Sequence, residues 1–258
     1  MLDYVGGAIS PEMETPKLLW LRENRPQVFD AAWALFDLAE PLDGPTGQRL
    51  ADVFPVDRDV HVVTNSLTTA LTLLEKVLKD HPDDTGAIHY YIHATEASNT
   101  PERALPYADA LAALAPGSGH LVHMPAHIYA RVGRWHDAVI ANQRAIEADN
   151  NYLAACRPGP GVYPLGYVPH NHHFLWFAAT MTGNRQIALA AAESTSERTS
   201  DPQLMRMAGM EAMQNFAVTP LFAKVRFGQW QAILQTPEPA ADLPYMRAIW
   251  HYAQGIAA

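Results

Sequence analysis

The 258-residue sequence predicts an all-α protein in which helix–turn–helix pairs stack into a solenoid. The first observation is an internal repeat, since Ala104 in PERALPYADALAALAP aligns with Ala138 in RWHDAVIANQRAIEAD, 34 residues further along. The second is that turn-forming residues recur at one fixed place in the repeat. The third is that apolar residues keep helical spacing between the turns, as at Leu67, Leu71 and Leu74.

The turn-formers and small residues set the register of the repeats. One repeat begins at Thr85, the next at Gly119 and a third at Pro169. The fifteenth residue of each repeat is then a turn-former, namely Asn99, Gly133 and Gly183. The twentieth is an alanine where two helices would pack closely, namely Ala104, Ala138 and Ala188. Because 34 residues is the period of the tetratricopeptide repeat, we predict a tetratricopeptide-like solenoid of about four repeats with a helical N-terminal cap.

The chain divides into three stretches. Residues 1–47 predict two helices, over 16–24 and from 26 to about 39, that would cover the exposed apolar end of the solenoid. Residues 48–65 are expected to be a connector, although DVHVV could form a short strand. Ser66 is a good N-cap for a helix over residues 67–79, and residues 66–258 form the predicted solenoid.

The spacing between the second and third repeats exceeds the period, and the additional residues fall within 150–168. This stretch contains RPGPGVYPLGYVP, whose prolines and glycines predict a loop without a helix. A long ordered loop in a compact domain is often functional. We therefore expect either a lid beside the histidine face or a simple spacer.

Histidines dominate one stripe of the first helix of each repeat. Places two, five, nine and twelve of that helix share a face, and equivalent places of successive repeats stack along the concave surface of a solenoid. These places hold seven imidazoles and one carboxylate: His89, His93 and Glu96, then His120, His123 and His127, then His170 and His173. The sequence therefore predicts that these side chains converge.

Clustered imidazoles favour a metal site, because neutral imidazole is the commonest side-chain ligand of zinc and similar ions. The i,i+4 spacing within each histidine pair lets one helix offer two ligands to one ion. We predict one or two divalent transition-metal ions, zinc first, with Mn, Fe, Co, Ni and Cu also compatible. The predicted ligands are His89, His93, His123, His127, His170 and His173, with His120 and Glu96 as further candidates.

Pro125 lies between His123 and His127 and cannot donate a backbone hydrogen bond. The helix therefore either kinks there or begins near Met124, in which case His120 and His123 approach from an entry loop. Both arrangements aim His123 and His127 inward.

A metal ion with an open coordination position makes hydrolysis the simplest chemistry, because it lowers the pKa of a bound water toward ~7 and polarises a carbonyl or phosphoryl oxygen. Glu96 would act as general base, and Tyr129 and Tyr167 would stabilise a developing oxyanion. The predicted function is a metal-dependent hydrolase of a small-molecule ester or phosphoester. The alternatives are a non-catalytic scaffold that binds a peptide, with the histidines in a hydrogen-bonded network, and a metal-binding protein without catalysis.

Composition excludes several other classes of protein. The net charge of −9 disfavours nucleic acid, which requires a basic face. No apolar run approaches the roughly 20 residues that span a bilayer, and no signal peptide is recognisable, so no membrane partner is expected. Cys156 is alone, which fits a reducing, cytoplasmic compartment. Apolar helix faces at the ends of the solenoid predict a homodimer.

Residues 66–258 resemble the C-terminal part of bacterial tetratricopeptide-repeat proteins that carry HYYIHA, GHLVHMPxHIY and HNxHF. These motifs stand here at residues 89–94, 119–129 and 170–174, and RFGQW and LPYMRAIWHYAQG follow. The resemblance implies an α-solenoid and the same histidine pattern.

Residues 6–47 resemble a fragment of the FGGY carbohydrate kinases, and of ribulokinases in particular, through GGAISPEM, TPKLLWLREN and FDLAEPL. The glycine-rich phosphate-binding turns and the catalytic aspartate of those kinases do not follow in the sequence. We therefore expect no kinase activity.

Overall fold

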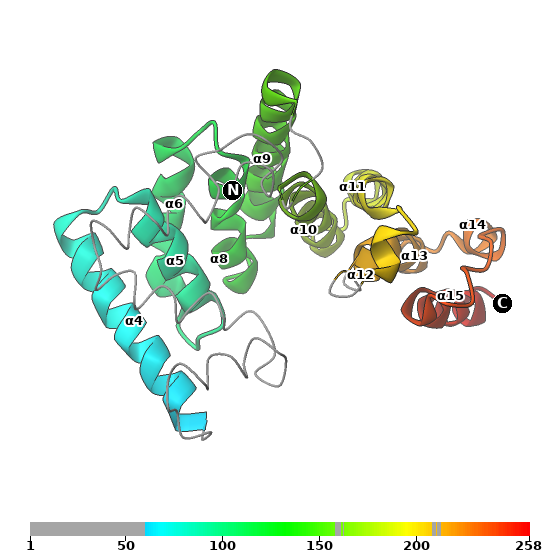
Figure 1. Ribbon diagram of the computed structural model, residues 1–258, viewed down its shortest axis with the longest axis horizontal. Coiled ribbons are helices and arrows are strands. Elements are labelled where there is room, and N and C mark those ends of the chain that lie inside the picture. Colours follow the sequence, from blue (N-terminus) through cyan, green and yellow to red (C-terminus); the bar gives the residue numbers. More distant parts are fainter. Residues whose placement is uncertain (1–59, 158–160, 162, 208–209, 211–212) are drawn as a thin grey trace. The chain divides into compact units, whose positions relative to one another are not determined.

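The computed structural model describes residues 60–157, 161, 163–207, 210 and 213–258, and every regular element in these ranges is a helix (Figure 1). The predicted all-α class is therefore confirmed for the described residues. The helices predicted within residues 1–47 lie outside them, as does the connector up to residue 59. No helix in the described ranges is long and apolar enough to cross a membrane.

The described chain forms two compact units that meet in the sequence between Val132 and Gly133. The described part of the N-terminal unit contains α4 (Val60–Asp80), α5 (Thr85–Glu96), the 3-10 helix η2 (Pro101–Ala104), α6 (Leu105–Leu114), α7 (Gly119–His123) and α8 (Pro125–Arg131). Helix α5 packs against α4, α6 and α8. It is therefore the central helix of this unit.

Side-chain caps fix where the helices of the N-terminal unit begin. The Asp84 carboxylate accepts a hydrogen bond from the backbone N–H of Ala87 (2.9 Å), which starts α5 at Thr85. Ser118 does the same for the N–H of Leu121 (3.3 Å), which starts α7 at Gly119. Each cap satisfies one of the backbone donors that a helix N-terminus leaves open. Both helices thus begin at the predicted residues.

Helix α4 begins earlier than the sequence predicts. It starts at Val60, so Ser66 lies inside the helix and is not its N-cap, and the DVHVV stretch is neither a strand nor a connector from residue 60 onward. The β-branched residues in this stretch cost only a few tenths of a kcal/mol each in a helix. Elongation of an existing helix is cooperative and outweighs that cost.

Helices α7 and α8 follow each other in series around Met124, whose backbone is itself helical (φ −49°, ψ −38°). Pro125 occupies the first turn of α8, where the missing N–H is tolerated. The alternative in which the first helix begins near Met124 after an entry loop is therefore wrong, because His120 and His123 already lie on the helical turn of α7. The helical path is instead divided at Pro125, where α8 begins.

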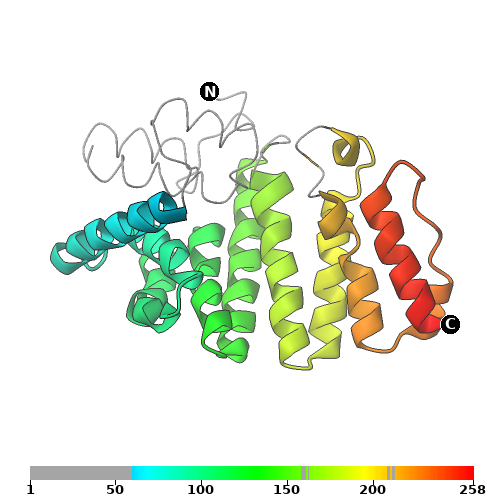
Figure 2. The same ribbon diagram turned by 90° about the horizontal axis from the view of Figure 1, so that it is seen from below.

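The C-terminal unit contains α9 (Trp135–Cys156), the π-helical turn η3 (Tyr163–Tyr167), α10 (Val168–Met181), α11 (Arg185–Thr199), the 3-10 helix η4 (Leu204–Arg206), α12 (Met213–Ala217), α13 (Thr219–Arg226), α14 (Trp230–Leu234) and α15 (Pro244–Ala257). Helix α10 packs against α9 and α11, α11 packs against α13, and α15 packs against α13 and α14 (Figure 2).

The turn and packing residues of the predicted register take the expected places. Gly133 and Gly183 have positive φ angles of 80° and 72°, which favour glycine because it lacks a Cβ. The three alanines at the twentieth place are each 0% exposed, namely Ala104, Ala138 and Ala188. Small side chains thus permit close packing where the repeat pattern placed them.

The loop predicted for residues 150–168 is shorter than expected. Helix α9 continues to Cys156, because no proline or glycine occurs before residue 158, and Tyr163–Tyr167 forms the turn η3. The fully buried Asp149 carboxylate accepts hydrogen bonds from the Tyr163 hydroxyl (2.5 Å) and the Asn171 amide (2.8 Å). These bonds attach η3 to α9 and α10.

Replacing the buried Ala188 of α11 by leucine should lower the free energy of unfolding by about 1–3 kcal/mol, because a larger side chain overpacks the helix contact. The matched change Ala190→Leu, at an exposed position of the same helix, should alter it by no more than about 0.5 kcal/mol. Urea denaturation followed by circular dichroism measures both. Equal effects of the two substitutions would contradict close packing at Ala188.

Candidate metal centre

The N-terminal unit gathers five histidines and one glutamate from three of its helices. Helix α5 contributes His89, His93 and Glu96, α7 contributes His120 and His123, and α8 contributes His127. Four of the five imidazoles are buried, whereas the His93 side chain is 39% exposed. The cluster is therefore largely enclosed and reaches solvent at His93.

A first group of side chains forms between α5 and α7. The Nε2 atoms of His89 and His120 lie 2.9 Å apart, and their rings meet edge to face at a centroid distance of 4.9 Å. The His93 ring lies 4.9 Å from the His89 ring. One ring nitrogen from each of these three histidines falls within 4.8 Å of the others, so the group could hold a metal ion.

A second group forms around the Glu96 carboxylate. Its Oε1 lies 2.9 Å from His93 Nδ1, and its Oε2 lies 2.6 Å from His127 Nδ1. The other nitrogen of His127, Nε2, lies 2.9 Å from His123 Nε2. Glu96, His93 and His127 also offer ligand atoms within 4.8 Å of one another. Both groups contain His93, so they form one continuous cluster.

The Glu96 contacts determine which nitrogens of two histidines carry protons. Burial alone would raise the carboxyl pKa, but the hydrogen bonds from His127 and His93 outweigh it and hold the pKa of Glu96 well below its usual range. An ionised carboxylate only accepts hydrogen bonds, so His93 and His127 each donate from Nδ1. The Nε2 atom of the neutral His127 ring then keeps its lone pair and accepts a hydrogen bond from His123 Nε2.

Burial also keeps His127 in the form that binds metals. Desolvation lowers the pKa of His127, and the opposing attraction of the Glu96 carboxylate does not cancel this effect. The neutral ring is the form that donates a lone pair to a cation.

The distances within the cluster suit tetrahedral coordination. Zinc–nitrogen bonds of about 2.0–2.1 Å place neighbouring ligand nitrogens about 3.3 Å apart in a tetrahedron. The Nε2 atoms of His89 and His120 are 2.9 Å apart, as are those of His123 and His127. Each pair would need to separate by only a few tenths of an ångström to hold an ion of this size.

The C-terminal unit holds three further residues of the predicted site. His170 lies against Phe174, at a ring distance of 5.8 Å, and Tyr167 stacks on Tyr163 at 5.7 Å. His173 lies between Trp176 (5.0 Å) and Phe216 (5.1 Å), and burial lowers its pKa to about 4. The participation of His170, His173 and Tyr167 in a metal site stays a prediction.

The structure changes the roles expected for Tyr129 and His120. Tyr129 donates its hydroxyl to Asp109 Oδ1 (2.7 Å), so stabilising an oxyanion would require it to give up this bond. His120, which the sequence offered only as a further candidate, is a full member of the first group. Its place in the histidine stripe is the sequence signal that indicates this role.

Comparison with known proteins finds a likeness to a short segment only. No protein-family model and no solved structure matches the chain. The FGGY carbohydrate kinase domain-containing proteins of Homo sapiens and Xenopus laevis are each 51% identical over 43 residues, which is 16% of this chain. The chain spans 8% of the length of these relatives. They belong to the same kinase family that residues 6–47 resemble.

Replacing Glu96 by glutamine should weaken metal binding by about 10–100-fold, because His93 and His127 would lose the carboxylate that fixes their tautomers and orientations. Calorimetric titration of zinc into the metal-free protein measures this. The matched change Glu102→Gln, at an exposed position, should leave the affinity unchanged. Zinc affinity in Glu96→Gln equal to that of the wild type would contradict the orienting role.

Proposed function

We propose that this chain is a metal-dependent hydrolase in which His89, His93 and His120 hold a divalent transition-metal ion, zinc first, next to an ester or phosphoester. The convergence of three ring nitrogens within 4.8 Å carries this proposal. Three protein ligands leave a fourth tetrahedral position for water, as in catalytic zinc sites. The partial exposure of His93 lets water and substrate approach that position.

The bound ion and the residues around it would have separate roles in hydrolysis. A bound ion would supply Lewis acidity and a water of lowered pKa. Glu96 Oε1 lies 2.9 Å from Nδ1 of His93, so this carboxylate would fix the orientation of one of the three proposed ligands. Both oxygens of Glu96 already accept hydrogen bonds, which favours an orienting role for this residue over the role of general base that the sequence predicts. The lowered pKa of its carboxyl agrees, since an effective base has a pKa near the working pH.

We also propose that the helices form a tetratricopeptide-like solenoid of about four repeats, in line with the resemblance of residues 66–258 to that family. The support comes from the helix starts at Thr85 and Gly119, the positive-φ turns at Gly133 and Gly183, and the buried alanines at the twentieth place.

A second candidate function is a scaffold that binds an apolar segment of a peptide. Aromatic side chains in the C-terminal unit favour it, because the Trp176 ring lies 6.3 Å from Phe222, which lies 6.4 Å from Tyr252. Tyr252 is 48% exposed, so this row reaches the surface. Aromatic groups of this kind often anchor a peptide. A scaffold of this type would not depend on a metal.

The hydrolase proposal is tested with chromogenic esters, namely p-nitrophenyl acetate and bis-p-nitrophenyl phosphate. Chelator-treated protein should hydrolyse them no faster than buffer, and adding zinc should restore the activity. His120→Ala should stay inactive after zinc is added, whereas His81→Ala, at an exposed position of the same unit, should behave as the wild type.

Three outcomes decide whether the hydrolase proposal holds. Activity that follows zinc occupancy supports the hydrolase. Stoichiometric zinc without hydrolysis would leave a metal-binding protein. Hydrolysis that persists without metal, or that is unchanged in His120→Ala, would contradict the proposed site.

A further inference from the structure

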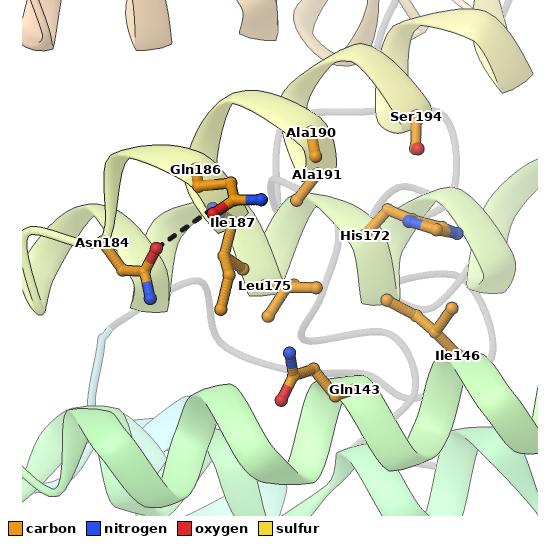
Figure 3. Close-up of a pocket in the computed structure, with 10 residues that line it drawn as sticks. All are labelled: Gln143, Ile146, His172, Leu175, Asn184, Gln186, Ile187, Ala190, Ala191 and Ser194. Carbon is orange, nitrogen blue, oxygen red and sulfur yellow. Dashed lines mark hydrogen bonds between the residues drawn. The ribbon is translucent and has the colours of Figure 1, made fainter.

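A hollow of about 500 Å³ lies in the C-terminal unit, lined by residues of α9, α10 and α11 (Figure 3). Its buried lining is formed by His172 and Leu175 of α10 and by Ala191 of α11. The half-buried side chains of Ile146 and Ile187 add apolar surface. This volume lies within the roughly 300–1,000 Å³ of common small-molecule sites.

His172 gives this hollow a polar group that lacks a partner. The residue is 7% exposed, and its Nε2 atom is buried without a hydrogen-bond partner among the described residues. A buried nitrogen left in this state costs about 1–3 kcal/mol. His172 follows His170 by two places and precedes His173 by one, so it lies on a different face of α10 from those two residues. A ligand group that formed a hydrogen bond with His172 Nε2 would remove this unfavourable free energy.

The lining is uncharged. Burial, followed by the charge of Arg198, lowers the pKa of His172 to about 4, so its ring is neutral at physiological pH. The polar lining residues nearer the surface include the amides of Gln143 and Gln186. The Asn184 side chain is already used, because it accepts a hydrogen bond from the backbone N–H of Ile187 (3.1 Å) and caps α11. An ionic ligand would therefore find no charged partner in this lining.

We propose that this hollow binds a small uncharged molecule with an apolar body and a hydroxyl group, and that the hydroxyl bonds to His172 Nε2. A hydroxyl both donates and accepts, so it fits either tautomer of the neutral ring. The apolar body packs on Leu175, Ala191 and Ile187, and the amides of Gln143 and Gln186 contact the exposed side of the molecule. No residue of the metal cluster lines the hollow. Binding here does not require a metal.

Nuclear magnetic resonance of the full chain with ¹⁵N-labelled histidine tests the proposal, with benzyl alcohol as the probe. Benzyl alcohol should shift the ring nitrogens of His172 in a saturable manner, before and after chelator treatment. Benzoate and benzylammonium, which have similar size but carry a charge, should bind at least about tenfold more weakly. His172→Phe should abolish the saturable binding as followed by ligand-detected signals, and His136→Phe, an exposed control in the same unit, should retain it.

The proposal is overturned by a non-saturable response at His172, by equal binding of the charged probes, or by unchanged binding in His172→Phe. Circular dichroism confirms that each variant is folded. Because His172→Phe could shift helix α10, Ala190→Trp serves as a second variant. It places a large side chain at an exposed position of the lining and should weaken benzyl alcohol binding while leaving the fold intact.

Discussion

The histidine cluster depends on the two hydrogen bonds that the Glu96 carboxylate accepts. The carboxylate joins His93 on its own helix to His127 of α8, through contacts of 2.9 and 2.6 Å. A half-buried carboxylate without such donors would be costly, and buried imidazoles without a fixed tautomer would be poor ligands. The Glu96 contacts therefore supply donors to the carboxylate and fix the tautomers of the two imidazoles. The arrangement of these side chains follows from the close packing of α5 against α8.

The two units have different chemistry. The cluster in the N-terminal unit places five imidazoles beside one carboxylate, which suits a divalent cation. The hollow in the C-terminal unit presents apolar side chains, amides and one neutral histidine, which suits an uncharged molecule. His89 and His172 illustrate the contrast, because both are buried, yet only His89 has a second imidazole within hydrogen-bond distance. Histidine content alone thus does not identify a metal ligand.

Much of the arrangement could be predicted from sequence, because it depends on local rules. Helix starts at Thr85 and Gly119 follow from caps at Asp84 and Ser118, and the turn at Gly183 follows from the need for positive φ. The spacing of the histidines along the sequence also predicts which of them lie on the same face of a helix.

Other features depend on tertiary packing and were not predictable in this way. The repeat register predicts that Glu96 and His127 converge, but the 2.6 Å hydrogen bond between them depends on how closely α5 approaches α8. The Tyr129 hydroxyl bonds to Asp109, which no local pattern indicates. Helix α9 extends to Cys156, because the prolines and glycines that predict a loop begin only at Pro158 and do not prevent a helix before it.

The most direct test of the central claim is the metal content of protein purified without a histidine tag, measured by mass spectrometry. We predict a stoichiometric transition metal in the wild type and its loss in the His89→Ala, His120→Ala double variant. Wild-type protein that carries no transition metal, and takes up none when zinc, manganese or copper is added, would contradict it.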